Sequence, residues 1–401
     1  MHRQGGASAT VIVVSRHRPR ELERCLSALT RQTHPHLEVV LVADPASLQT
    51  LPDLPLKRVS CDVPNISVAR NLGLALAAGE VVLFIDDDAL AEPGWALALT
   101  RPFADPRVMA ATGFTRGPDG LAWQVRAERI TPSGQSYEIE VSEAQFLGPE
   151  EGAPVSTVGT NCAFRRSTLL EIGGFDPAFA YHLDESDVNL RLAERFPVRL
   201  TAVIPEAEVI HGLAPGVSRA VVGVPHDLSA IGRSTAFFAA RHGGDVDWLR
   251  QAQRQRLLRH MVAGRLDPLQ VGSLLATLES GIAEAAAAGV PPDPVWTHPA
   301  PPAFQPFPAS PPGAEFIWGW HWNARKLRAR AADAVAEGKL VTLLLLTPTF
   351  LPHRLTLRDG GWWEQYGGVW GASRPGDSHM ILMTRSARIA REWGFFAAVR
   401  R

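Results

Sequence analysis

The sequence predicts an α/β fold, with a mostly parallel sheet flanked by helices, then a helical segment and a small tryptophan-rich C-terminal region. Three observations predict this class. Short apolar runs rich in β-branched residues alternate with amphipathic segments over the first 100 residues. The links between them are short, which favours right-handed crossovers between parallel strands. At roughly 100–200 residues per domain, the chain of 401 residues, 46% of them hydrophobic, can bury two or three cores.

Hydrophobic patterning predicts the elements of the first 100 residues. Runs that are apolar throughout are typical of strands buried on both faces of a sheet. Leu22, Cys25, Leu26 and Leu29 instead form one helical stripe. In chain order we expect strands at Ala9–Ser15, Leu37–Val42 and Val81–Ile85, and helices at Arg20–Gln32 and at Val68–Ala78, the second ended by Gly79.

Two changes in composition divide the rest of the chain. Long helical stretches begin after residue 225. Ten of the residues from Pro291 to Pro312 are proline, which predicts a stiff linker. We therefore expect a sheet domain over residues 1–225, a helical extension over 226–290, a linker over 291–314 and a C-terminal region over 315–401.

The C-terminal region is rich in tryptophan. Together with the proline-rich stretch it holds eight of the 11 tryptophan residues. Leu340–Phe350 is strand-like, His353–Arg358 alternates in polarity, and Gly360–Gly368 is expected to form a glycine-bounded aromatic loop. The rings of this loop and of Trp318–Trp322 either fill a small core or stack on sugars.

Charge and cysteine content exclude several classes of protein. Forty Lys and Arg against 41 Asp and Glu leave a net charge of -1, which argues against a general nucleic-acid binder. Three widely spaced cysteines without a CxxC pair argue against a disulfide framework or a cysteine-based zinc site. No run is long enough to span a bilayer and no signal peptide is recognisable. We expect a cytoplasmic protein without a transmembrane segment, which still allows a peripheral membrane contact.

Three consecutive aspartates follow the third predicted strand. Asp86, Asp87 and Asp88 repel one another at the sheet edge where ligands of parallel sheets bind. In an extended chain Asp86 and Asp88 point to one side and Asp87 to the other. Two carboxylates on one side suit one Mg²⁺ or Mn²⁺, although a solvated acidic turn is the alternative.

A second acidic group, Asp184-Glu185-Ser186-Asp187, begins a predicted helix. Acidic residues in a first turn favour the helix dipole, which is one explanation. The other explanation is that one of these carboxylates acts as a general base. A carboxylate at a rigid helix start beside the glycine-rich segment Gly173–Pro177 is well placed for this role.

Three single residues have two interpretations each. His211 follows a strand-like segment and is either structural or a ligand. Arg70 either caps a helix or pairs with a carboxylate, or its guanidinium binds a diphosphate through two hydrogen bonds. Asp44, at the end of the second predicted strand, forms a turn or contacts a nucleotide.

The ordered set of these segments resembles glycosyltransferase family 2, the large group of inverting enzymes with the Rossmann-like GT-A fold. The segments that carry the resemblance span residues 9–212, about half of the chain. They are ATVIVVSRHRP with LSALTRQT, LEVVLVADPAS, NISVARNLGLALAAGEVVLFIDDDA, GTNCAFRRSTLLEIGGFDPAF, and DESDVNLRLAERF followed by IHG.

The resemblance implies a nucleotide-diphosphate sugar as donor and a divalent metal, Mn²⁺ or Mg²⁺. Asp44 matches the family's contact to the nucleotide base, and Arg70 lies where a sugar-phosphate contact is often found. Asp86 and Asp88 match the DxD pair, with Asp88 as direct metal ligand and with Asp86 and Asp87 on the nucleotide-sugar side. His211 matches a residue that often approaches the metal or the diphosphate.

The DESD stretch matches the family's motif that carries the base. Either Asp184 or Glu185 then takes the proton of the acceptor hydroxyl, and Glu185 is preferred because aligning Asp187 and Arg191 puts it at the usual position. The resemblance also implies an acceptor that is a saccharide, a glycan precursor or another hydroxyl, in polysaccharide biosynthesis. The catalytic group is thus expected to be Glu185 with Asp184 and Asp187.

Two departures and two other classes limit this assignment. His17 stands where the family usually has Asn, and Asp-Pro-Ala-Ser replaces the usual turn after the second strand, so the nucleotide is not readable. A nucleotidyltransferase that forms sugar nucleotides would want a glycine-rich phosphate loop, which SRHRPRELE lacks. A non-catalytic carbohydrate-binding or scaffold protein would not need intact DDD and DESD motifs.

Overall fold

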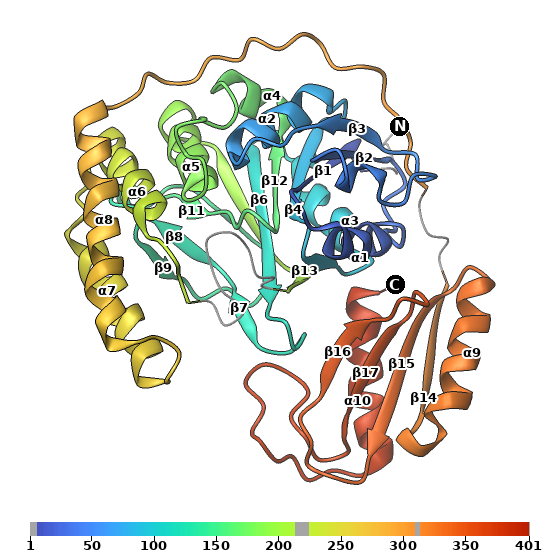
Figure 1. The fold of residues 1–401 in the computed structure, drawn as a ribbon. Helices are drawn as coiled ribbons and strands as arrows, with labels where there is room; N and C mark the ends of the chain where they lie inside the picture. The colour runs from blue at the N-terminus through green and yellow to red at the C-terminus, as the bar shows by residue number, and fades with distance from the viewer. Residues whose placement is uncertain (1–5, 213–223, 309–312, 401) are drawn as a thin grey trace.

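The computed structural model describes residues 6–212, 224–308 and 313–400. Its main element is a ten-stranded sheet of order β10-β13-β6-β12-β4-β1-β2-β3, in which β5 also pairs with β13 and β7 with β6 (Figure 1). A small three-stranded sheet has the order β11-β8-β9. The strands are β1 (Ala9–Ser15), β2 (Leu37–Ala43), β3 (Lys57–Ser60), β4 (Val81–Asp86), β5 (Ala89–Ala91), β6 (Val108–Arg116), β7 (Trp123–Val125), β8 (Glu128–Ile130), β9 (Ser136–Glu138), β10 (Gln145–Leu147), β11 (Val155–Ser156), β12 (Cys162–Arg165) and β13 (Leu200–His211).

Most of the central strands point in one direction. β1 pairs parallel with both β2 and β4, and β2 pairs parallel with β3. β12 runs antiparallel to both β4 and β6, while β13 is parallel to β6. β3, β2, β1, β4, β6 and β13 therefore share one direction and β12 is reversed. The predicted α/β class with a mostly parallel sheet is confirmed.

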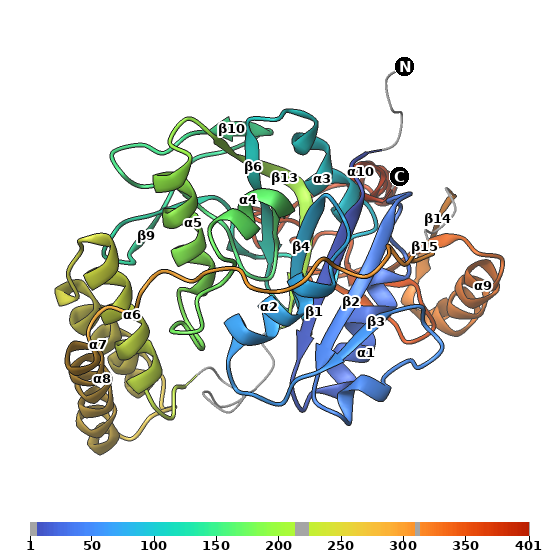
Figure 2. The same cartoon turned by 90° about the horizontal axis from the view of Figure 1, so that it is seen from above.

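Helices cover both faces of this sheet, which explains why its central strands are mostly apolar (Figure 2). Along β1, Val11 and Val13 pack in the core cluster on the α1 and α3 side, and Ile12 packs in the cluster on the α2, α4 and α5 side. These helices are α1 (Pro19–Leu29), α2 (Ile66–Leu76), α3 (Trp95–Thr100), α4 (Arg166–Glu171) and α5 (Asp184–Arg195), with the 3₁₀ turns η1 (Ser47–Gln49) and η2 (Arg101–Ala104).

The predicted end of the second helix at Gly79 is wrong. The helix α2 ends at Leu76, and the extended residue Ala77 caps it. Gly79 is instead a point of close approach, because a Cβ there would lie 2.7 Å from the backbone nitrogen of Thr10 in β1. The glycine is needed for contact with the sheet and not for the helix terminus.

The helical segment and the proline-rich stretch follow the sheet. The helices are α6 (Ser229–His242), α7 (Asp247–Val262) and α8 (Pro268–Ala288). The chain after α8 crosses over the sheet domain as an extended strap, visible in both Figure 1 and Figure 2. Its Phe307 is buried in the main core, and its backbone N–H donates to the carbonyl of Leu37 in β2.

The C-terminal region is a four-stranded sheet of order β14-β15-β17-β16 with one helix on each face. The segment Gly360–Gly368, predicted as a loop, contains strand β17 instead, and its Trp362 and Trp363 are buried. The sequence analysis also missed both helices. The elements are β14 (Ala314–Trp320), η3 (His321–Asn323), α9 (Ala324–Ala336), β15 (Leu340–Thr347), β16 (Arg354–Leu357), β17 (Trp363–Gly368) and α10 (Arg385–Val399).

Within the described residues, no helix combines the length and the apolar character needed to cross a membrane. The four-part division of the chain at residues 225, 290 and 314 stays a proposal.

Candidate active site

The acidic triplet lies where β4 ends and the chain turns into β5. Strand β13, the last strand of the main sheet along the chain, pairs antiparallel with β5 and places His211 opposite Ala89, directly beside the triplet. The close approach needs glycine at position 212, since a Cβ there would meet the carbonyl oxygen of Asp88 at 2.9 Å. Strand pairing therefore joins residues more than 120 positions apart in sequence.

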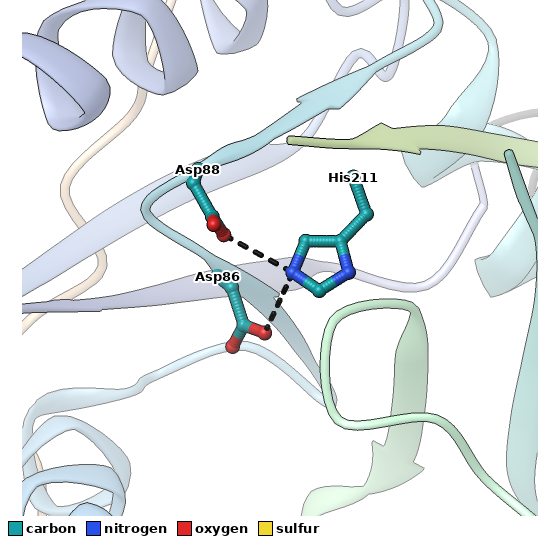
Figure 3. A group of neighbouring side chains, drawn as sticks. All are labelled: Asp86, Asp88 and His211. Atoms are coloured by element: carbon teal, nitrogen blue, oxygen red, sulfur yellow. Dashed lines mark ion pairs between the residues drawn. The ribbon is translucent and has the colours of Figure 1, made fainter. Parts of the chain in front are cut away.

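Asp86, Asp88 and His211 converge at this edge (Figure 3). The Nε2 atom of His211 lies 3.1 Å from Oδ1 of Asp88 and 3.8 Å from Oδ2 of Asp86. One donor atom from each of the three residues lies within 4.8 Å of the other two. Two carboxylate oxygens and one imidazole nitrogen at this spacing can hold one divalent cation.

Gln124 in β7 supports His211 from behind, and the sequence analysis did not identify it. Its side-chain amide lies 3.0 Å from Nδ1 of His211. A hydrogen bond at one ring nitrogen orients the imidazole and leaves the other nitrogen for a ligand or a carboxylate. No sequence signal marks Gln124, because only the pairing of β7 with β6 brings it to the site.

Asp87 lies in the turn between β4 and β5 and contacts Ser15 and Arg18 instead of joining the group with His211. The hydroxyl of Ser15 donates to its Oδ2 at 2.7 Å, and Arg18 donates to its Oδ1 at 3.2 Å. Burial raises the pKa of Asp87 to about 7, against the opposing effect of Arg18. Arg18 also lies 4.0 Å from Asp88, and the sequence analysis did not assign it a role.

Arg70 is buried among three carboxylates. Its guanidinium pairs closely with Asp184 and lies 3.5 Å from Glu185 and 3.7 Å from Asp86. It also donates to the carbonyl of Gly159 at 3.2 Å. The helix α2 thus supplies one cation that connects the acidic triplet with the start of α5.

The adjacent carboxyls of Asp184 and Glu185 differ in exposure and in pKa. Asp184 is almost fully buried, whereas the side chain of Glu185 is 24% exposed. Burial raises the pKa of Asp184 well above its usual value despite the neighbouring Arg70. For Glu185, burial is outweighed by Arg70 and by a hydrogen bond with Asp184, so its pKa is lowered. Glu185 therefore has the lower pKa and is the more accessible of the two.

Asp187 faces into the fold rather than toward this cluster. Its carboxylate lies 2.7 Å from Arg191, 3.0 Å from Arg241 and 3.1 Å from His242. The side chain is fully buried. These contacts fasten α5 to α6, which is a structural role.

Asp44 lies in the turn after β2, and its carboxylate accepts hydrogen bonds from backbone N–H groups. It accepts from the backbone nitrogens of His17, Ala46 and Ser47 at 2.7–3.2 Å. Burial opposes ionisation, but these hydrogen bonds dominate and lower the pKa of Asp44 to about 2. His17 holds a left-handed backbone conformation, with φ of 59°, to make this contact.

Comparison with known proteins identifies a matching family model, a curated relative and similar solved structures. Residues 10–173 match the model of Glycosyl transferase family 2. The chain is 30% identical over 177 residues to a Glucosyl-dolichyl phosphate glucuronosyltransferase of Haloferax volcanii, covering 42% of this chain and 55% of the relative. It therefore spans about half the length of that curated relative.

Two solved structures are similar over larger parts of the chain. One is GalNAc-T7 with UDP, GalNAc and Mn²⁺, at 15% identity, a TM-score of 0.44, and coverage of 63% of this chain and 55% of the other. The second is the mannosyltransferase PcManGT from Pyrobaculum calidifontis with GDP-Man and Mn²⁺, at 23% identity, a TM-score of 0.40, and coverage of 72% and 78%.

The resemblance seen in the sequence is thus confirmed by the family model, over residues that include β1, β4 and the acidic triplet. The mostly parallel sheet with helices on both faces agrees with the GT-A fold that this family implies. Residues 10–173 are thus similar to glycosyltransferase family 2.

Proposed function

We propose that this protein is a metal-dependent, inverting glycosyltransferase that moves a sugar from a nucleotide-diphosphate donor to an acceptor hydroxyl. One observation carries the proposal. Asp86 belongs both to the group with Asp88 and His211 and to the group around Arg70 with Glu185. A site for the diphosphate and a site for the acceptor proton are therefore side by side, as transfer in one displacement requires.

The residues at the sheet edge fit a divalent metal. Asp88 and His211 are the proposed ligands, with Asp86 beside them, and the oxygen and nitrogen set suits Mn²⁺ and accepts Mg²⁺ less readily. A bound divalent cation would neutralise charge on the leaving diphosphate. Gln124 keeps the His211 ring in place for this role.

Glu185 is the proposed base. It is ionised, because its pKa is lowered, and it is exposed enough to meet an acceptor hydroxyl. Asp184 is buried against Arg70 and is the proposed positioning residue for that guanidinium. We assign Asp187 to positioning α5, on the contacts described above, rather than to the chemistry.

Arg70, Asp86, Asp87 and Asp44 are the proposed donor side of the site. Arg70 is close enough to the triplet to contact a sugar or a phosphate oxygen after a small side-chain shift. Asp87 orients Arg18, and Asp44 shapes the turn that would lie against the nucleotide base.

The acceptor is proposed as a saccharide or a sugar carried on a lipid phosphate. The second class is supported by the name of the Haloferax relative, which acts on a glucosyl-dolichyl phosphate.

The test is a screen of sugar nucleotides by calorimetry, with Mn²⁺, with Mg²⁺ and with chelator. We expect one donor class to bind in the presence of metal and to lose most of its affinity with chelator. Turnover of that donor with a glucosyl polyprenyl phosphate or an oligosaccharide, followed by NMR of the product, should show inversion at the anomeric carbon. Retention, or tight binding in chelator, would contradict the proposal.

A further inference from the structure

The C-terminal sheet ends in a surface that the proposed transfer site does not use. β14, β15 and β17 are parallel, so their carboxyl ends meet at one edge. The segments 318–326, 348–354 and 369–387 gather there, and we call them the tip. The tip lies at the lower end of this unit in Figure 1, at the start of α10 and away from the end of α10 that contacts the main sheet.

Exposed apolar side chains are concentrated on the tip. Sixteen large hydrophobic side chains are exposed among the described residues, and six of them lie in these three short segments. Their exposed fractions reach 60% for Trp322 and 78% for Leu382. The six are Trp318, Trp322, Phe350, Leu351, Met380 and Leu382.

Ring contacts join these segments into one surface. Phe350 of the second segment packs against Trp370 of the third at 5.3 Å, and Arg385 of the third lies over the ring of Trp320 of the first at 5.6 Å. The indole N–H of Trp370 donates to the carbonyl of Met383 at 3.0 Å. The exposed side chains are therefore held on an ordered platform.

The charge of the tip has one sign. Its three segments contain five Arg and Lys residues and a single acid, Asp377. Asp377 is already paired with Arg391 at 2.6 Å. The exposed cations are Arg325, Lys326, Arg354 and Arg385.

An apolar groove of about 660 Å³ opens beside the tip, between β14 and α10. Phe316, Trp318, Ile389 and Trp393 line it, and Arg385 lies over the ring of Trp318 at 5.4 Å. Glu315 also lines the groove, but its carboxylate is paired with Arg330 at 2.8 Å and Lys339 at 3.1 Å. Mostly apolar walls with a cation at the rim match a hydrocarbon chain that carries an anionic head group.

We infer that the tip docks this protein on an anionic lipid surface. Tryptophan and cationic side chains are favoured at the boundary between water and lipid, where rings enter the interface and charges attract anionic head groups. The net charge of -1 for the whole chain hides this local excess of cations.

The same surface also relates to the candidate site. The segment that carries Met380 and Leu382 also carries Pro375 and Gly376, which line a polar cleft of about 470 Å³ with β7. That cleft includes Gln124, the partner of His211. Docking would hold this cleft close to a lipid-borne acceptor, although the docking itself does not depend on the transfer reaction.

The test is flotation of the full chain with vesicles at low salt. We expect binding to vesicles of equal phosphatidylglycerol and phosphatidylcholine, and weak binding to phosphatidylcholine alone. Trp322→Ser with Leu382→Ser should lower partitioning at least about tenfold, because two apolar side chains no longer enter the interface. The matched control is Leu269→Ser on α8, which is 88% exposed and lies outside the tip.

Charge variants separate the electrostatic part. Arg325→Gln with Lys326→Gln should weaken binding to anionic vesicles by about fivefold per charge removed, whereas Arg254→Gln, exposed on α7, should not. Absence of binding by the wild type, or equal losses in the controls, would overturn the inference. So would a change of oligomeric state by light scattering in the tip variants without a change in vesicle binding. Donor affinity, measured in parallel, stays unchanged, which separates this result from the proposed function.

Discussion

Two groups of buried charges in this protein have opposite character. Around the candidate site, two arginines, Arg18 and Arg70, and the imidazole of His211 face five carboxylates, two of them partly exposed: 37% for Asp86 and 24% for Glu185. Where the C-terminal region meets the main sheet, two arginines face two glutamates and none is more than 7% exposed. We call this second group the anchor cluster; its members are Glu92, Arg116, Glu208 and Arg400.

The difference follows from electrostatics. In the anchor cluster, Glu92 forms ion pairs with Arg116 at 2.6 Å and with Arg400 at 2.7 Å. Glu208 pairs with Arg116 at 2.7 Å, so every charged side chain has a partner of opposite sign. In the site, burial together with Asp88 and Glu185 raises the pKa of Asp86, although Arg70 and His211 oppose this. An excess of one sign that the protein does not neutralise indicates a place for a bound cation. Balanced charges indicate structure, and unbalanced ones indicate a site.

The largest expected effect is on the site. Asp88→Asn should lower metal-dependent turnover at least about 10³-fold, because the proposed ligand loses its charge. Its melting temperature should stay equal to or above that of the wild type, since a like charge is removed from the triplet. A turnover assay with Mn²⁺ and thermal unfolding measure the two effects, and calorimetry with Mn²⁺ measures donor affinity. Wild-type donor affinity in this variant would refute the ligand assignment.

The base is the next test. Glu185→Gln should reduce turnover by roughly 10²–10⁴-fold, the usual contribution of a general base, while donor affinity changes little. Asp184→Asn is the matched variant one residue upstream, and it should act through the position of Arg70. If Asp184→Asn showed the larger loss of turnover at unchanged donor affinity, the base would be Asp184.

Breaking the anchor cluster should cost stability and not chemistry. Glu92→Gln leaves Arg116 and Arg400 buried without their shared counter-charge, which should lower the free energy of unfolding by roughly 3–5 kcal/mol. Chemical denaturation measures this loss. Turnover per folded molecule at low temperature should stay near that of the wild type, and a large loss there would make the comparison wrong.

Asp44 gives the smallest effect, and it depends on pH. Its folded-state pKa of about 2 lies below the usual 3.8, so ionisation of this buried carboxylate stabilises the fold. That contribution, about 2 kcal/mol, is complete above about pH 4 and is lost as the pH falls toward 2. Asp44→Asn should therefore unfold more easily at pH 7, with a difference from the wild type that disappears near pH 2. A difference independent of pH would point to packing instead.

Local hydrophobic patterning was enough to predict the central strands but not every strand and helix of the C-terminal region. The strands β1, β2 and β4 were predicted within a residue because both faces of each are buried and most of their residues are apolar. Strand β17 was missed because glycines bound it and polar residues interrupt it. The helix α10 was missed since its buried Arg388 and Glu392, which pair at 2.9 Å, break the apolar stripe.

The sequence by itself determined the α/β class, the acidic triplet at the end of β4 and the acidic start of α5, because each depends on residues adjacent along the chain. Only the tertiary structure decided that Arg70 joins the two acidic groups and that Gln124 supports His211. The tertiary structure also gives Glu185 and Asp187 different surroundings, although they lie two positions apart: Glu185 faces the site, and Asp187 faces the interior of the fold. The physical reason is that exposure and charge balance are set by strand pairing and helix packing between distant segments, and these leave no mark on local sequence.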